Sequence, residues 1–97
     1  MFTSKQRSKL KGLAMNIDPV ATIGKGGASE NFLDSVDKAL NARELVKISV
    51  LQNAAEPARE YAEKIATFLN AQIVCVIGKK IVLYRYSEKP GVKHVEF

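Results

Sequence analysis

A cluster of glycines around a lysine is the feature of this sequence most suited to binding chemistry. The stretch TIGKGGASE, residues 22–30, holds three of the six glycines of the chain within four positions, with Lys25 among them. Glycine permits positive φ and close approach of another backbone, but it weakens regular structure. Bare amides beside a cation favour an anionic group such as a phosphate. The cluster therefore predicts either a demanding turn or a phosphate contact.

Free nucleotides fit this cluster poorly. Ser29 stands where GxGxxG needs its third glycine, and no GK[ST] completes a Walker loop. The segment Gly24-Lys25-Gly26-Gly27 does match the GxxG with which KH-type modules let a nucleic-acid backbone approach their own. Because GxxG alone is nonspecific, a plain glycine turn before a helix is an equally good interpretation.

Basic residues elsewhere favour a nucleic acid. The chain has 15 Lys and Arg against 10 Asp and Glu, a formal net charge of +5, and such an excess favours polyanionic partners. The candidate contacts outside the glycine cluster are Lys5, Arg7, Lys9 and Lys11 near the N-terminus and Lys79, Lys80 and Arg85 on a predicted hairpin. Cations also flank ordinary amphipathic helices, but three basic sites in one small domain favour RNA or DNA.

Catalysis has few candidate groups. The single histidine, His94, lies in the C-terminal segment, and the single cysteine, Cys75, lies in an apolar run where a small buried hydrophobe is the simpler interpretation. A Cys/His pair would need the tail to fold back, and neither residue has an activating neighbour in sequence. Metal-ligand spacing of cysteines and histidines is also missing. We therefore expect no enzyme activity, no cofactor and no metal.

Length and composition predict one soluble domain. The chain has 97 residues, of which 46% are hydrophobic and 26% charged, values ordinary for a globular protein. A lone cysteine suits a reducing compartment. The N-terminus lacks the apolar region of a signal peptide, and no uncharged apolar run approaches the roughly 20 residues of a membrane span. We expect a cytoplasmic protein without a membrane partner.

The elements that position these residues follow from caps and periodicity. A first helix begins near Thr3, which forms a capping-box pattern with Gln6, and stops before Asp18-Pro19. Residues 20–23 form a short strand, and Ser29 caps the next helix. The glycine cluster is thus expected to join the end of a strand to the start of a helix.

The second half adds three strands and one helix. Residues 44–51 alternate as a half-buried strand does, a third helix begins near Glu56-Pro57, and residues 72–86 form two strands around Gly78-Lys79. Residues 73–77 are apolar on both faces, which predicts an interior strand. The fold class is therefore α/β (α+β), a single α-β-α-β-α-β-β domain whose four-stranded mixed sheet packs against helices.

Four segments resemble a known family in order and in register. SKQRSKLKGLA, DPVATIGKGG, ALNARELVKISV and VIGKKIVLYR are similar to the CRM domain (chloroplast RNA splicing and ribosome maturation), above all to its stand-alone bacterial YhbY-type members. The resemblance implies a fold similar to the C-terminal domain of translation initiation factor three, RNA binding without catalysis, and association with precursors of the large ribosomal subunit. By position, it assigns RNA contacts to the glycine cluster and to the cations of the first helix.

The resemblance leads to a specific expectation for each part of the chain. Residues 1–86 are predicted to form an RNA-binding CRM domain that contacts rRNA mainly through phosphates and acts as a monomer. Residues 87–97 are predicted to be a flexible tail, with at most a short edge contact. The alternative is a protein-interaction module that docks on ribosomal proteins or another assembly factor through its sheet face. Binding through phosphates depends steeply on salt, whereas an apolar protein interface does not.

Acidic residues directly after the glycine cluster complicate this expectation. Glu30, Asp34 and Asp37 all lie on the predicted second helix. A carboxylate near a bound phosphate repels it. These side chains must therefore point away from the RNA or weaken its binding.

Overall fold

The predicted order of elements is confirmed in the computed structural model, which describes residues 2–97. The helices are α1 (Ser4–Ala14), α2 (Glu30–Arg43) and α3 (Ala58–Leu69), and the strands are β1 (Ala21–Ile23), β2 (Leu45–Val50), β3 (Gln72–Ile77) and β4 (Lys80–Tyr84).

The first two helices begin at the caps that the sequence predicted. Thr3 Oγ1 accepts a hydrogen bond from the Gln6 N–H at 3.1 Å, and Gln6 Oε1 accepts one from the Thr3 N–H at 3.0 Å. Ser29 Oγ accepts from the Phe32 N–H at 3.2 Å. Each bond satisfies an amide that the helix cannot pair internally. The start of α2, and with it the exit from the glycine cluster, is therefore fixed by a local signal.

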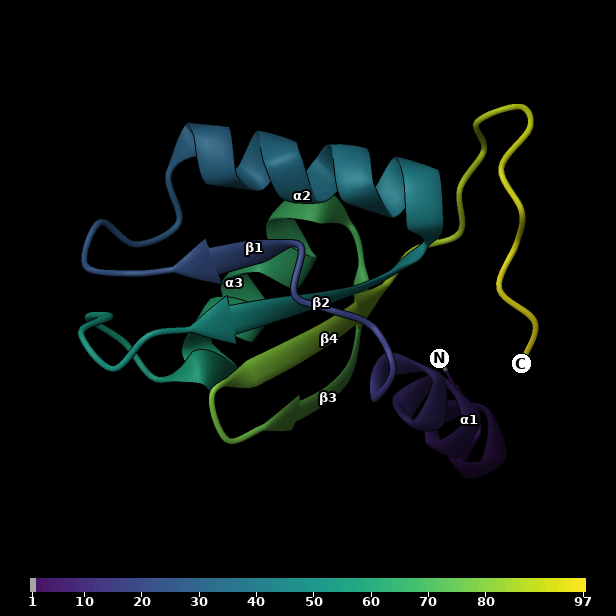
Figure 1. Cartoon of the computed structure of the whole chain (residues 1–97), viewed down its shortest axis with the longest axis horizontal. Coiled ribbons are helices and arrows are strands. Elements are labelled where there is room, and N and C mark those ends of the chain that lie inside the picture. The colour runs from purple at the N-terminus through teal and green to yellow at the C-terminus, as the bar shows by residue number, and fades with distance from the viewer. Residues whose placement is uncertain (1) are drawn as a thin grey trace.

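The four strands form one mixed sheet in the order β1-β2-β4-β3, with β1 parallel to β2 and the other pairs antiparallel (Figure 1). The prediction of an interior strand for residues 73–77 is wrong, because β3 lies at the edge of the sheet. Its residues are apolar on both sides because α3 contacts one face of β3 and α1 the other. Helices thus cover both faces of a strand that has only one neighbour.

Each face of the sheet has its own core. Helices α2 and α3 cover one face, where Val36, Leu40 and Ile65 pack on Ile48 and Leu83. On the second face, α1 packs Leu10 and Ala14 on a cluster of Leu45, Val74, Val82 and Tyr84. Helix α1 has only 11 residues and lies toward one end of the sheet (Figure 1). The other end of this second face, which includes Lys80, remains exposed.

A guanidinium group fixes α1 to the edge strand. The ladder between β3 and β4 shifts register between Ile73 and Cys75, a bulge that disturbs regular pairing. Arg7 Nη1 donates to the carbonyl oxygens of Ile73 at 3.1 Å and Val74 at 2.7 Å. The sequence predicted Arg7 as an RNA contact. In the structure, its guanidinium already donates to these two backbone carbonyls of β3.

We expect Arg7→Met to lower the free energy of unfolding by about 1 to 2 kcal/mol, because it removes charge-assisted hydrogen bonds to two carbonyls. Lys5→Met is the matched control, since it also removes one exposed cation from α1 and is expected to change stability by less than about 0.5 kcal/mol. Urea unfolding of the two variants beside the parent measures the difference. Equal stability of both variants would show that the Arg7 contacts contribute nothing.

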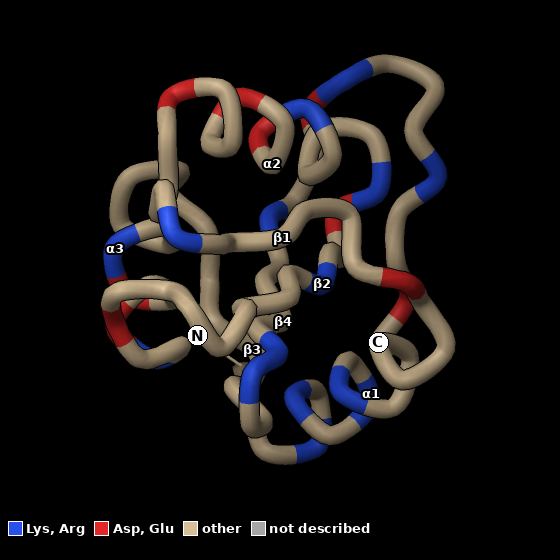
Figure 2. The backbone as a smooth tube through the Cα atoms, turned by 60° about the vertical axis from the view of Figure 1, so that its left-hand side comes forward, with Lys and Arg blue, Asp and Glu red and all other residues tan. Residues whose placement is uncertain are grey.

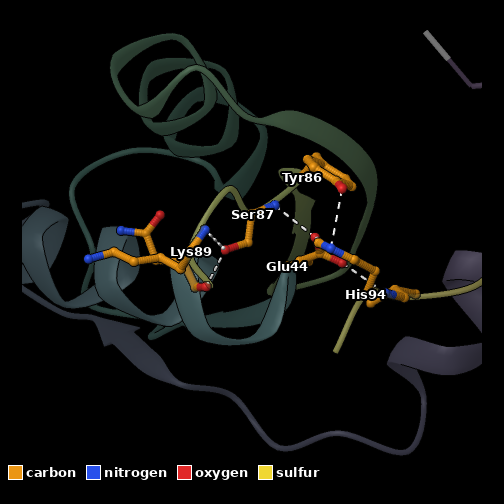
Figure 3. A network of polar contacts seen from close by, with 7 residues as sticks. Glu44, Tyr86, Ser87, Lys89 and His94 are labelled. Carbon is orange, nitrogen blue, oxygen red and sulfur yellow. Dashed lines mark hydrogen bonds and ion pairs between the residues drawn. The ribbon is translucent and has the colours of Figure 1, made fainter. Parts of the chain in front are cut away.

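The C-terminal residues 87–97 have no helix or strand but contact the domain through a buried carboxylate. Glu44 is fully buried, and its carboxylate accepts hydrogen bonds from the N–H groups of Ser87 and Val95, both at 2.7 Å. His94 Nδ1 lies 2.7 Å from the same carboxylate (Figure 3). These contacts of Glu44 could not be foreseen from local sequence patterns. The mobility of the tail stays a prediction.

Aromatic rings join the two ends of the chain. The ring centroids of Phe2 and Phe97 lie 5.7 and 5.0 Å from that of Tyr84, and 5.8 Å from each other, all in edge-to-face geometry. Such pairs contribute about 0.5 to 1.5 kcal/mol beyond the area they bury. Phe97 is therefore half-buried and packs against the core of the second face, beside α1.

Candidate nucleic-acid interface

The glycine cluster forms a β-turn at the end of β1. The Gly27 N–H donates to the Gly24 carbonyl at 3.0 Å, and the Lys25 side chain is exposed at the tip. The N–H groups of Lys25 and Gly26 donate no hydrogen bond to any residue between 2 and 97. The predicted turn is thus present, and two of its amides remain free for a ligand.

The turn requires only one of its three glycines. Gly27 has a φ of +72°, which L side chains rarely adopt. A Cβ at Gly24 would make an ordinary 3.5 Å contact with Leu51, and a Cβ at Gly26 would meet nothing within 4 Å. Glycine at positions 24 and 26 is therefore not explained by the turn, whereas a bare backbone suits close approach of a second chain.

A row of side chains leads from this turn across the open part of the second face. Thr22 pairs with Ser49, Ser49 with Lys80, and Lys80 with Ile77, so the row crosses all four strands. Lys80 Nζ donates to Ser49 Oγ at 2.9 Å. Three steps between neighbouring strands span about 14 Å. This cross-strand row ends two residues before Gly24.

A basic groove of about 440 Å³ lies beside the row, between α1 and the sheet. Three cations line it: Lys11 from α1, Lys47 from β2 and Lys80 from β4. The remaining lining is apolar and consists of Ala14, Met15, Cys75, Ile77 and Val82. The groove thus combines an apolar floor with positive charge from three separate elements.

Lys47 is a candidate contact that sequence reasoning missed. Alternation along β2 placed Lys47 on the side opposite Val46 and Ile48, and this signal was available from the sequence. The alternation could not reveal that α1 leaves this side partly open. Lys47 is half-buried and pairs with Val82, beside the row formed by Ser49 and Lys80.

The structure gathers only some of the predicted cations. In Figure 2, the blue segments of α1 lie in the lower part of the view, and the red segments of α2 lie at the top. Lys79 lies between β3 and β4, and Lys80 begins β4. Lys11 lines the basic groove, whereas Lys9 lines a different cavity with Arg43 and Lys93. The cations of α1 are therefore divided between two flanks of the helix.

Arg85 lies apart from the basic groove. Its guanidinium pairs with Asp37 Oδ1 at 2.8 Å and donates to the Leu69 carbonyl at 2.8 Å and to Asn41 Oδ1 at 3.0 Å. These contacts connect the end of β4 to α2 and α3. The prediction of an RNA contact for Arg85 is not tested by this geometry, but its charge already has an internal partner.

The acidic residues of α2 point away from the basic groove. Asp34 pairs with Lys38 at 3.0 Å, and Asp37 pairs with Arg85. Together with Glu30, these carboxylates line a hollow between α2 and α3, which cover the opposite face of the sheet. The negative charge that follows the glycine turn in sequence is therefore separated in space from the three lysines of the basic groove.

Cys75 forms part of the groove floor and is half-buried rather than fully buried as expected. The reason is that α1 covers only part of this face. Burial raises the pKa of the Cys75 thiol, although the nearby Lys11, Arg7 and Lys47 act in the opposite direction. A raised pKa keeps the thiol protonated at neutral pH, so a nucleophilic role gains no support.

His94 does not pair with Cys75. Its Nδ1 contacts Glu44, its Nε2 lies 3.2 Å from the Tyr86 hydroxyl, and the rings of His94 and Tyr86 stack with centroids 4.4 Å apart (Figure 3). Within residues 2–97, no three His, Cys, Asp or Glu side chains gather as metal ligands would. None of the three helices in this part of the chain is long and apolar enough to cross a bilayer.

Comparisons with known proteins agree on one family. The family model CRS1 / YhbY (CRM) domain matches residues 2–85. The "Probable RNA-binding protein YqeI" of Bacillus subtilis (strain 168) is 40% identical over 89 residues, which cover 92% of this chain and 93% of the relative. An "RNA-binding protein" of Haemophilus influenzae is 35% identical over 92 residues, 95% of this chain and 93% of the relative. The solution structure of SAV1595 from Staphylococcus aureus superposes with a TM-score of 0.77 at 44% identity and covers 93% of this chain and 94% of that one.

Proposed function

Since the chain belongs to the CRS1/YhbY (CRM) domain family, we propose that it is an RNA-binding protein without enzyme activity that associates with the rRNA of large-subunit precursors. The names of its relatives support RNA binding. The ribosomal target rests on the family resemblance of the sequence. The observation that carries the proposal is the basic groove, which the cross-strand row connects to the glycine turn on one open face.

Phosphates are the chemical groups that this face suits best. Lys11, Lys47 and Lys80 supply charge around the groove, and Lys25 supplies charge at the turn. The free amides of the turn add donors where a backbone can come close. Contacts to phosphates fix the position of an RNA without reading its sequence. The protein would therefore recognise the path of the rRNA backbone over the row and the turn.

We expect Lys25→Glu to weaken binding of large-subunit rRNA fragments by roughly tenfold or more at low salt, because it replaces an attraction by a repulsion beside the turn. It should leave the fold unchanged, since an exposed loop charge contributes little to stability. Fluorescence anisotropy across a salt series measures both the affinity and its salt slope. Melting temperatures measured beside it report the fold.

Lys38→Glu is the matched control for this variant. It changes the net charge by the same amount, but on α2, where Lys38 is exposed and pairs with Asp34. Its RNA affinity should stay near that of the parent. Equal affinities of the Lys25→Glu variant and the parent at every salt concentration would exclude the turn from the RNA surface. Binding that is insensitive to salt would favour the alternative, a protein-docking module.

Crosslinking in cells tests the ribosomal target itself. RNA attached to the parent protein should derive from precursor rRNA of the large subunit, and Lys25→Glu should lower its yield. Attached RNA drawn evenly from unrelated transcripts would contradict the ribosomal part of the proposal, while leaving RNA binding intact.

A further inference from the structure

Two large apolar side chains are exposed at the edge of the basic groove. Met15 is 77% exposed and Ile77 is 53% exposed, and both line the groove. Single exposed hydrophobic residues are ordinary on a protein surface. Here, however, they continue an apolar floor that includes Cys75 and Val82. Contiguous apolar surface inside a hollow with a polar rim is typical of a binding site.

The three lysines around this floor restrict the class of ligand. Lys11, Lys47 and Lys80 belong to α1, β2 and β4, and the groove contains no acidic residue. A ligand that matches it has an apolar part and at least one negative charge beside it. A nucleotide has both, since its base is apolar on its faces and its phosphate is anionic.

We propose that the basic groove receives the base of an unpaired nucleotide, so that the protein prefers RNA with unpaired residues to continuous duplex. This inference rests on the proposed function, because it specifies which RNA that same surface binds. The base lies on the apolar floor between Met15 and Ile77. Its flanking phosphates meet the lysines and continue along the cross-strand row toward the glycine turn.

A continuous duplex cannot place a base on the apolar floor of the groove. In an A-form helix the bases are stacked inside, and the surface presents phosphates and 2′-hydroxyl groups. Duplex RNA would therefore reach the lysines but leave Met15, Cys75 and Ile77 against water. Unpaired nucleotides in loops and bulges can turn their bases outward. Only these gain the apolar contact.

The sulfur atoms of the groove suit an aromatic ring. Met15 is a flexible thioether, and thioethers make favourable contacts with aromatic rings. The Cys75 thiol lies on the floor of the same groove. Apart from the three lysines and the Cys75 thiol, the side chains that line the groove carry no hydrogen-bonding group. The site should accept any of the four bases with little discrimination.

Two RNAs with the same number of phosphates test the preference. One is a blunt duplex, and the other is a hairpin whose loop consists of unpaired uridines. The parent protein should bind the hairpin roughly three- to tenfold more tightly, as expected for a contact between sulfur or aliphatic groups and one ring. Equal affinity for the two RNAs would overturn this inference and leave RNA binding standing. Failure to bind either RNA would overturn the proposed function as well.

Substitutions in the floor separate the apolar contact from the charges. Met15→Ser together with Ile77→Ser should lower the ratio of hairpin affinity to duplex affinity to about one, and this ratio is the readout whatever the change in the affinity for duplex. The matched control is Phe68→Ser, which removes an aromatic side chain that is 71% exposed on α3, away from the groove. The control should keep the full preference. A preference retained in the double variant would overturn the inference.

The single cysteine provides a second readout on the unmodified chain. Hairpin RNA should slow the reaction of Cys75 with a maleimide by severalfold at a fixed pH, and duplex RNA at equal occupancy should slow it less. Equal protection by the two RNAs at equal occupancy would overturn the inference. A free apolar peptide that protects Cys75 in place of the hairpin would identify the groove as a protein site and also overturn it.

Discussion

Replacement of Glu44 by glutamine is expected to lower the free energy of unfolding by about 3 kcal/mol, because breaking a buried charged network leaves its partners unpaired. The carboxylate accepts hydrogen bonds from two N–H groups, those of Ser87 and Val95, and contacts His94. A glutamine keeps one oxygen and turns an NH₂ group toward these donors. Glu44 also has a φ of 66°, which glutamine shares, so the difference reports the carboxylate alone.

Urea unfolding measures this loss. Glu96→Gln is the matched control because it neutralises an exposed acid of the C-terminal tail that Glu44 contacts. The control should change stability by less than about 0.5 kcal/mol. If Glu44→Gln unfolds at the same urea concentration as the control, the buried contacts do not hold the tail on the domain.

The same carboxylate gives the parent a specific dependence on pH. Burial by itself raises the pKa of Glu44, but hydrogen bonds from Ser87, His94 and Val95 overcome this effect and lower the pKa below its ordinary value of 4.5. A pKa that is lower in the folded state stabilises the fold above the unfolded value, and this contribution is lost as the pH falls through the folded value. Stability of the parent should therefore fall in acid more than that of Glu44→Gln. Parallel curves of stability against pH for the two proteins would contradict the role of this network.

Reversal of two charges in the basic groove should have the largest effect on RNA binding. We expect Lys47→Glu combined with Lys80→Glu to weaken binding at low salt by about 100-fold or more, since each change replaces a proposed phosphate contact by a repulsion. The slope of log affinity against log salt should become shallower by about 1.4 to 1.8. Anisotropy titrations with the rRNA fragments used for Lys25→Glu give both quantities.

The control for this pair is Lys38→Glu combined with Lys89→Glu. It has the same change in net charge, and both lysines border a different hollow beside α2. Its RNA affinity should fall much less than that of the groove variant, because only the general loss of positive charge acts on it. Similar losses in the two double variants would mean that net charge, and not the groove, determines RNA binding.

Local signals predicted most of the fold. The Thr3–Gln6 capping box, Ser29 and the turn at Gly78 each act within a few residues, so the sequence alone locates them. The position of β3 at the sheet edge could not be predicted in this way. A strand that is covered on both faces has the same apolar pattern at the edge of a sheet as in its interior. Helix α1, which covers one face of β3, lies far earlier in the chain: Arg7 and Ile73, which are in contact, are separated by 66 positions.

The candidate site was predicted less completely for a related reason. Lys25, Lys11 and Lys80 were identified from charge and spacing, and the structure places each on the exposed surface. Arg7 and Arg85 belong to the same sequence pattern, but each finds an acceptor far along the chain, such as Asn41, 44 positions from Arg85. Whether a cation is free or paired depends on these distant partners. Lys47 was missed because the extent of α1 over the sheet is also a property of the folded chain.

The contact between Phe2, Tyr84 and Phe97 determines how the molecule can be attached to anything else. Both ends of the described chain lie at the same pole, and the glycine turn lies at the opposite pole (Figure 1). A surface tether, a fluorescent protein or a further domain joined at either end would therefore leave from one side. The turn and the open half of the sheet would face outward in every such fusion, so immobilised protein should present the proposed phosphate contacts of the turn to solution whichever end is fixed.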